Sequence, residues 1–161
     1  MALNQLPKYV YYLLIAQAFN LIAAVLSVTV SAIVGLKLAP TQALATVPYG
    51  LQFLAMLLTT FIFSFLMKRW GRHVVFQFGV LYLFAAGFLG YQALLKQDFW
   101  LLCLTHFSLG LFLSTASFYR FAASDRLSSE LIPKATALVI SGGVVAAVIA
   151  PVLAIQFQKV K

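Results

Sequence analysis

Charged side chains are scarce in this sequence. Of its 161 residues, 9% are charged, and the acidic residues are only Asp98, Asp125 and Glu130. A soluble domain carries roughly 25% charged residues, so the polar surface that keeps a globular protein in solution is missing. Because 63% of the residues are hydrophobic, we expect an integral membrane protein.

Residues that bind metals or perform catalysis are also few. Cys103 is the single cysteine, which excludes a disulfide framework and a cysteine-based metal site; we expect it to be a buried apolar side chain. His73 and His106 are expected at membrane depths that differ by about 20 Å, too far apart to hold one haem iron. Because no phosphate-binding loop, HExxH or G-x-S-x-G motif is present, we expect no enzyme activity, metal or cofactor.

The net charge of +8 does not indicate a nucleic-acid-binding protein. The cations fall in short gaps between apolar runs and form no basic face. Such cations are typical of membrane-topology signals and are attracted to anionic lipid head groups. We therefore expect membrane lipid, and no nucleic acid, as a partner.

Five apolar runs predict the fold class. A membrane-spanning helix needs about 20 apolar residues, and these runs do not alternate as transmembrane β-strands do. The sequence therefore predicts an all-α, polytopic transmembrane helix bundle in one domain, residues 1–161, with an uncleaved first span. The expected spans are about residues 9–36, 41–67, 74–95, 99–122 and 135–157.

The cations between the spans predict the orientation. The larger group lies on the side of the N-terminus, and the positive-inside rule then places that terminus in the cytoplasm. Lys159 and Lys161 are exceptions, because five spans place them outside. The cytoplasmic group is Lys8, Lys68, Arg69, Arg72, Arg120, Arg126 and Lys134, and the outer group is Lys37, Lys96, Lys159 and Lys161.

Polar and small side chains follow one face of three expected helices, at spacings of three and four. Polar groups at membrane depth face a bundle interior or a watery cavity. For Gln17 and Asn20, a cavity role and an interhelical hydrogen bond are both open; for His106, packing and a solute pathway are both open. Small residues allow close helix packing. The rows are Gln17, Asn20, Ala24, Ser27 and Ser31; His106, Gly110, Ser114, Ser117 and Arg120; and Gly142, Ala146, Ala150 and Ala154, beside Gly143, Ala147 and Pro151.

The basic segment MKRWGRHVV, residues 67–75, resembles a motif of the major facilitator superfamily. That motif, G-x-x-x-D-(R/K)-x-G-(R/K)-(R/K), connects the second and third helices of the family. The segments YRFAASD (119–125) and SGGVVAAVIAP (141–151) resemble the family's motifs at the end of helix four and in helix five. In the first motif Arg69, Gly71 and Arg72 match, while Ser64, Lys68 and His73 replace the Gly, the Asp and the last basic residue.

The resemblance implies a bacterial inner-membrane transporter with twelve helices in two halves and a solute site between the halves. This chain would supply about five helices of the N-terminal half and would need a complementary chain or a C-terminal half. The family's cavity is lined by helices one and four, which makes Gln17, Asn20, His106 and Arg120 the candidates for contact with an unidentified small solute.

The same resemblance implies a gating loop and a packing motif. The loop comprises Lys68, Arg69, Gly71, Arg72 and Asp125, with Arg72 paired to Asp125. The motif of helix five comprises Gly142, Gly143 and Pro151. Lys68 cannot replace the family's acid at a helix N-terminus, where the dipole repels a cation. The alternative is therefore a degenerate, facilitator-like structural or assembly subunit of a larger membrane complex, without transport activity.

Overall fold

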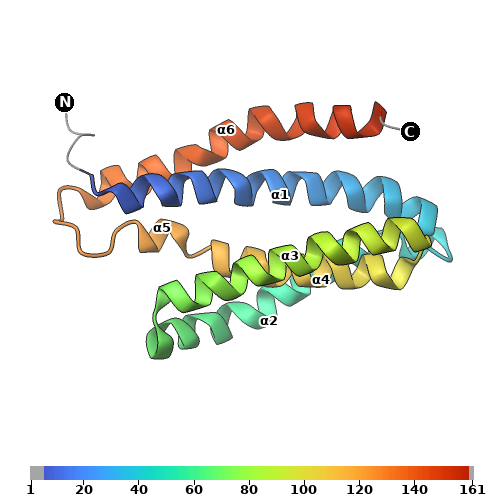
Figure 1. The fold of residues 1–161 in the computed structure, drawn as a ribbon, viewed down its shortest axis with the longest axis horizontal. Coiled ribbons are helices and arrows are strands. Elements are labelled where there is room, and N and C mark those ends of the chain that lie inside the picture. The colour runs from blue at the N-terminus through green and yellow to red at the C-terminus, as the bar shows by residue number, and fades with distance from the viewer. Residues whose placement is uncertain (1–5, 160–161) are drawn as a thin grey trace. The chain divides into compact units, whose positions relative to one another are not determined.

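Long helices account for most of the structure, a computed structural model in which residues 6–159 and the side chains of residues 6–153 are described. Within these described residues, five helical segments are long and apolar enough to cross a membrane. No strand occurs within residues 6–159, so the predicted all-α, multi-pass membrane fold is confirmed. The elements in Figure 1 are α1 (Lys8–Leu38), the 3₁₀-helix η2 (Gln42–Leu44), α2 (Val47–Trp70), α3 (Arg72–Lys96), α4 (Phe99–Ala116), α5 (Tyr119–Ala122) and α6 (Ile132–Lys159).

The chain divides into two compact units, each of which is described by itself. Unit 1 comprises Met1–Leu26 and Ala116–Lys161, and unit 2 comprises Ser27–Thr115. Unit 1 therefore contains the first part of α1 together with α5 and α6. Unit 2 contains the rest of α1 together with α2, α3 and most of α4. The predictions for Ala154, Lys159 and Lys161 concern side chains outside the described set.

Local chemistry sets several helix ends. α1 ends two residues before Pro40, which cannot continue a helix. α3 ends at Lys96, and the next residue, Gln97, has a left-handed φ of 51°. Asp98 then begins the next helix, because its Oδ1 accepts hydrogen bonds from the backbone N–H groups of Trp100 at 2.8 Å and Leu101 at 3.2 Å. These bonds satisfy donors that the first turn of α4 leaves unpaired.

A turn interrupts the helical stretch that the sequence predicted at about residues 99–122. α4 ends at Ala116, and the single turn α5 begins at Tyr119. Just before the interruption, the Thr115 hydroxyl donates a hydrogen bond of 2.7 Å to the carbonyl oxygen of Phe112. Hydroxyl groups that bond to the preceding turn compete with the helical ladder and bend helices, which accounts for a break at this place.

Within unit 2, α4 packs against both α2 and α3 through glycine. A Cβ on Gly110 of α4 would meet the backbone of Gln52 and the side chain of Ala55 on α2. A Cβ on Gly79 of α3 would meet the side chain of Thr115 on α4. The α4 backbone therefore lies close to that of α2 at Gly110, and the absence of a side chain at Gly79 leaves room for Thr115.

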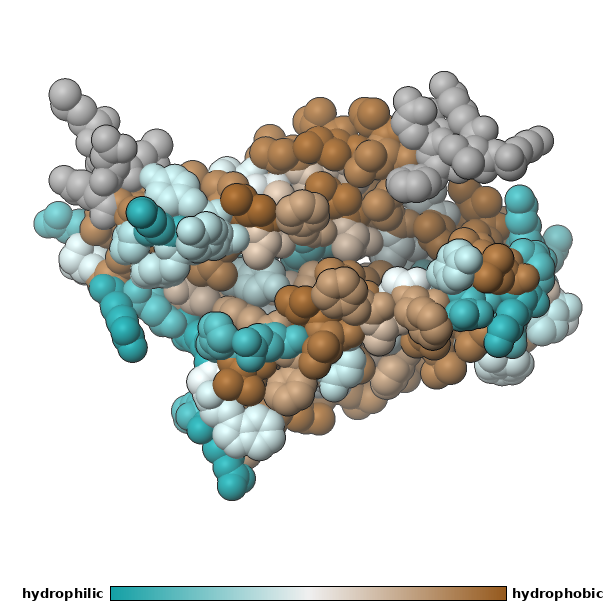
Figure 2. Space-filling model, viewed as in Figure 1, coloured by the Kyte–Doolittle hydropathy of each residue, from teal (hydrophilic) through white to brown (hydrophobic). Residues whose placement is uncertain are grey.

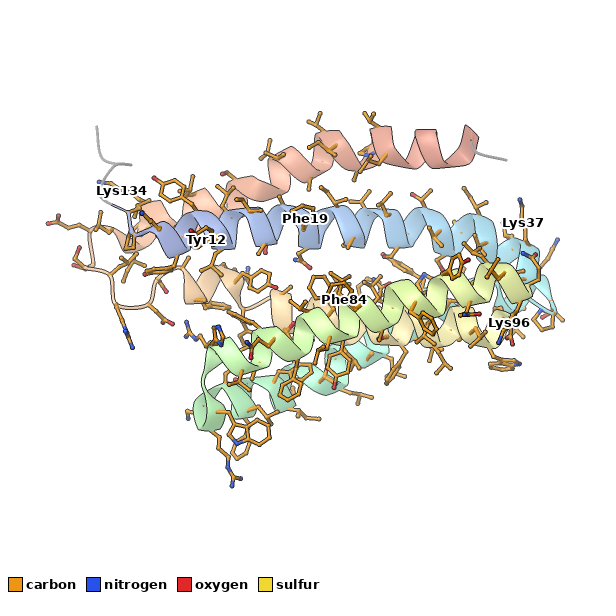
Figure 3. The ribbon with its side chains drawn as sticks, viewed as in Figure 1. Tyr12, Phe19, Lys37, Phe84, Lys96 and Lys134 are labelled. Atoms are coloured by element: carbon orange, nitrogen blue, oxygen red, sulfur yellow. The ribbon has the colours of Figure 1, made fainter. Side chains whose placement is uncertain are left out.

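Apolar side chains cover the outside of the helices, and cations lie near the helix ends. In Figure 2, brown hydrophobic residues follow the middles of the helices and teal residues gather toward their ends. Figure 3 shows the exposed rings of Phe19 on α1 and Phe84 on α3, which are 64% and 73% exposed. It also shows Lys37 and Lys96 at the ends of α1 and α3. Side chains that face lipid have this distribution.

Candidate functional site

Asn20 lies on α1, and its amide oxygen has no partner among the described residues. Its side chain is 7% exposed, and Oδ1 is buried without a hydrogen bond from any described residue. Gln17, one turn earlier, is only partly buried. Leu14 and Ala18, which approach α6 at Gly142, lie at least about 100° around α1 from Asn20. Asn20 therefore lies on a different face of α1 from Leu14 and Ala18, which pack on α6.

His106 is enclosed in unit 2 with a carbonyl oxygen near each ring nitrogen. The side chain is 1% exposed. Nδ1 lies 3.0 Å from the carbonyl oxygen of Leu102, and Nε2 lies 3.4 Å from that of Ser27 on α1. A neutral imidazole has one N–H, so it donates to only one of these two acceptors. This geometry fits the packing role that the sequence left open, and a role in a solute pathway stays a prediction.

The predicted polar face of α4 continues from His106 into a helix contact. Gly110 lies against α2, as described above. Ser114, one turn further, is fully buried, and its Oγ lies 3.2 Å from Oγ1 of Thr60 on α2. The row from His106 to Ser114 thus joins α4 to two neighbours in unit 2, α1 and α2.

Gln52 on α2 is a polar residue that the sequence interpretation did not select. It is 2% exposed, and its Oε1 is buried with no hydrogen-bond partner in the described part of the chain. The signal available in the sequence was chemical, because an amide within an apolar run is costly in a membrane. Periodic spacing does not indicate Gln52, because no polar residue follows it one turn later.

Arg120, the fourth predicted cavity residue, lies on α5 in unit 1. Its side chain is exposed, and the guanidinium carbon lies 4.9 Å from the centre of the Phe121 ring. That distance is typical of a cation–π contact. Gln17, Asn20 and Arg120 therefore belong to unit 1, whereas His106 and Gln52 belong to unit 2.

Gly71 forms a one-residue link between α2 and α3 at the basic segment. α2 ends at Trp70 and α3 begins at Arg72, and the φ of Gly71 is +86°. Glycine reaches this region without the strain that a Cβ causes, which explains why glycine occupies this position. Lys68 and Arg69 are exposed, and Arg72 is partly buried.

Asp125 lies in the connection between α5 and α6. Its backbone carbonyl oxygen accepts a 2.5 Å hydrogen bond from the hydroxyl of Tyr9, near the start of α1. This bond joins two parts of unit 1 that are 116 residues apart in the sequence. Arg72 belongs to unit 2 and Asp125 to unit 1, so their pairing stays a prediction.

The glycine row of α6 faces α1 inside unit 1. A Cβ on Gly142 would lie 2.6 Å from the carbonyl oxygen of Leu14, and one on Gly143 would lie 2.6 Å from Cδ1 of Leu21. Ala146 and Ala150 are fully buried on the same helix. Pro151 is exposed inside α6, where its ring removes one helical hydrogen bond.

Comparison with known proteins identifies a similar transporter. No family model matches the sequence, and no solved structure matches it. The chain is 32% identical over 148 residues to the riboflavin transporter RfnT of Brucella anthropi. The similarity covers 92% of this chain, which spans about 37% of the length of that relative.

Proposed function

We propose that this chain is part of a multi-pass transporter that carries a flavin-like small solute across a bacterial inner membrane. The observation that carries the proposal is the similarity to a riboflavin transporter over 92% of the chain. The five helices that are long and apolar enough to cross a membrane agree with it. Since the chain spans about 37% of that relative, we propose that a complementary chain or a C-terminal half completes the pathway.

The proposed architecture is the N-terminal half of a major facilitator. It rests on the three sequence motifs, and the excess of cations on one side predicts a cytoplasmic N-terminus. Helices that belong to half of such a fold keep small-residue rows and polar faces for their missing neighbours. The amide oxygen of Asn20, which has no partner in the described part of the chain, is consistent with this arrangement.

Asn20 is the proposed solute contact with the strongest structural support. No water compensates a buried amide oxygen in hydrocarbon, so a side chain of this kind points to a function within the membrane. Riboflavin carries N–H and O–H groups that can donate to such an oxygen. Gln17, His106 and Arg120 are the other proposed contacts, each argued from its helix face.

The proposed gating contact joins Arg72 to Asp125. A double-mutant cycle with Arg72→Ala and Asp125→Ala tests it, because residues in contact show a coupling energy of about 0.5–3 kcal/mol. If the effects of the two substitutions on uptake are additive, the two residues are not in contact and the proposed gating pair is wrong. Lys68→Asp restores the acid of the family motif, and increased uptake in this variant would show that Lys68 weakens the gate.

A structural role is the second candidate, and Lys68 is the observation that favours it. An exposed cation occupies the position where the family's motif carries its acid, so the gate of a working transporter is altered here. Purification in mild detergent followed by native mass spectrometry separates the candidates. A partner that carries the remaining helices supports a transporter, whereas a larger respiratory or photosynthetic assembly supports a structural subunit.

Riboflavin uptake tests the proposed transport directly. The chain is expressed with any co-purifying partner in a riboflavin-auxotrophic bacterium, and uptake of labelled riboflavin is measured. The variant Asn20→Ala loses one hydrogen bond to the solute, worth about 0.5–1.5 kcal/mol. Its uptake should therefore be lower than that of the wild type by up to about tenfold. Gly87→Ala is the matched control, because its Cβ would meet no heavy atom within 4 Å among the described residues.

Two results would contradict these assignments. If the wild-type assembly takes up no riboflavin, the transport proposal is wrong. If the double variant Gln17→Ala/Asn20→Ala takes up riboflavin as fast as the wild type, the proposed solute contacts on α1 are wrong, whereas the transport proposal still stands.

A further inference from the structure

Gln52 combines deep burial with an unused acceptor. It is 2% exposed, and Oε1 finds no hydrogen bond in the described structure. The rest of the buried face of α2 is Pro48, Ala55, Phe63 and Met67. Methionine has nearly the same length as glutamine and would fill this place without an unpaired polar atom. The amide therefore has a cost that packing alone does not explain.

The backbone at Gln52 is held by α4. A Cβ on Gly110 would overlap the carbonyl oxygen of Gln52 and would lie 2.9 Å from Cβ of Ala55. This contact fixes the position of the Gln52 backbone, from which the side-chain amide extends. Precise placement of a polar group by rigid helices is what recognition of a solute requires.

Building on the proposed transport of a flavin, we propose that Gln52 is a specificity-determining residue that recognises the imide edge of the flavin ring. An imide presents one N–H between two carbonyl groups. A carboxamide is complementary to it, because Oε1 accepts from the N–H while Nε2 donates to a neighbouring carbonyl. The amide is covered in this structure, so the contact forms in a second conformation that uncovers the side chain while the backbone of Gln52 stays against Gly110.

The side-chain hydroxyl groups of riboflavin are a second source of donors. A hydroxyl would satisfy Oε1 but would leave the amide N–H groups without a matching pair of acceptors. The imide satisfies both ends of the carboxamide at once. A site built on such a pair rejects an analogue that lacks the donor, because its buried acceptor then stays unpaired.

The test combines protein variants with flavin analogues. The protein is purified with any chain that accompanies it and reconstituted in lipid nanodiscs, and binding is measured by quenching of flavin fluorescence. The ligands are riboflavin, 3-methylriboflavin, which lacks the imide N–H, and lumiflavin, which keeps the imide and lacks the hydroxylated chain. The variants are Gln52→Met and the control Gln77→Met, at an exposed glutamine on α3.

The wild-type protein should bind riboflavin about tenfold more tightly than 3-methylriboflavin, the effect of about 1.4 kcal/mol for one lost donor. This preference should disappear in Gln52→Met, where the two affinities should be about equal, and should persist in Gln77→Met. The preference for riboflavin over lumiflavin should be the same in all three proteins. Gln52→Leu provides the same readout if the methionine variant does not accumulate.

Each contrary result has a distinct meaning. If Gln52→Met weakens all three ligands by one factor, the residue is structural and the proposal is overturned. If it removes discrimination against lumiflavin instead, the amide binds the hydroxylated chain and the imide assignment is wrong. If the wild-type protein binds riboflavin without discriminating against 3-methylriboflavin, this inference fails alone. If it binds no flavin, the proposed function fails.

Discussion

Replacing Gly142 by alanine should loosen α6 from α1. The new Cβ would lie 2.6 Å from the carbonyl oxygen of Leu14 and 3.3 Å from the amide nitrogen of Ala18, where ordinary contact begins at 3.4 Å. The nearest atom belongs to a helix backbone, so no side-chain rotation relieves the overlap. To reach ordinary contact at 3.4 Å from 2.6 Å, the two helices must separate locally by about 0.8 Å. A gap of about 0.5–1 Å removes a quarter to a half of the attraction in each dispersion contact.

The expected cost is that of overpacking, about 1–3 kcal/mol. The buried side chains of Ala146 and Ala150 follow Gly142 along the same face, so they lose contact with their neighbours as well. For a chain of this size, the thermal midpoint should fall by about 2–12 °C. Circular dichroism in detergent micelles at 222 nm measures this change.

Gly87→Ala is the control for the intrinsic effect of alanine in a helix. At Gly87 no heavy atom of the described residues lies within 4 Å of the added Cβ. Its midpoint should therefore stay unchanged or rise, because alanine is favoured over glycine by about 1 kcal/mol in a helix. Equal midpoints for Gly142→Ala and Gly87→Ala would refute the close contact between α6 and α1.

Three further predictions concern other contacts. Gly71→Ala should cost about 1–3 kcal/mol, because a φ of 86° with a ψ of 156° is almost confined to glycine; a thermal midpoint equal to that of the wild type would contradict this backbone geometry. Tyr9→Phe removes the donor to the Asp125 carbonyl and should cost about 0.5–1.5 kcal/mol; hydrogen exchange in the α5–α6 connection should become faster, and unchanged exchange would rule the bond out. A double-mutant cycle with Thr60→Val and Ser114→Ala should give a coupling of about 0.6 kcal/mol for their 3.2 Å contact; zero coupling in unfolding measurements would show that the hydroxyl groups do not interact.

The sequence predicted the helices because one strong signal dominates. An apolar run of about 20 residues or more is long enough to cross the membrane as a helix. Few other structures satisfy the backbone hydrogen bonds of such a run in lipid. The break at residues 117–118 escaped prediction, since it depends on where hydroxyl groups bond locally. Hydropathy does not distinguish Thr115, which bonds to Phe112, from a hydroxyl that faces another helix.

Prediction of single functional residues depended on periodic spacing, which explains both what it selected and what it missed. The row on α1 selected Asn20, whose amide is buried. Gln52 is buried even more deeply, and its Oε1 also lacks a hydrogen bond among the described residues, but no polar residue lies one turn later on α2. The bond from Tyr9 to Asp125 joins distant parts of the chain, and no local pattern encodes it.

The placement of cations at helix ends has an electrical consequence. Across a membrane, each elementary charge that moves through the full potential changes the free energy by about 2.3 kcal/mol per 100 mV. Lys37 and Lys96 lie at the ends of α1 and α3, and the cations beside Gly71 lie at the ends of α2 and α3. At helix ends we expect little of that potential to fall. A rearrangement of these helices therefore moves little charge through the field. In the proposed transport, the cations of these helices should therefore add little to any voltage dependence of solute uptake.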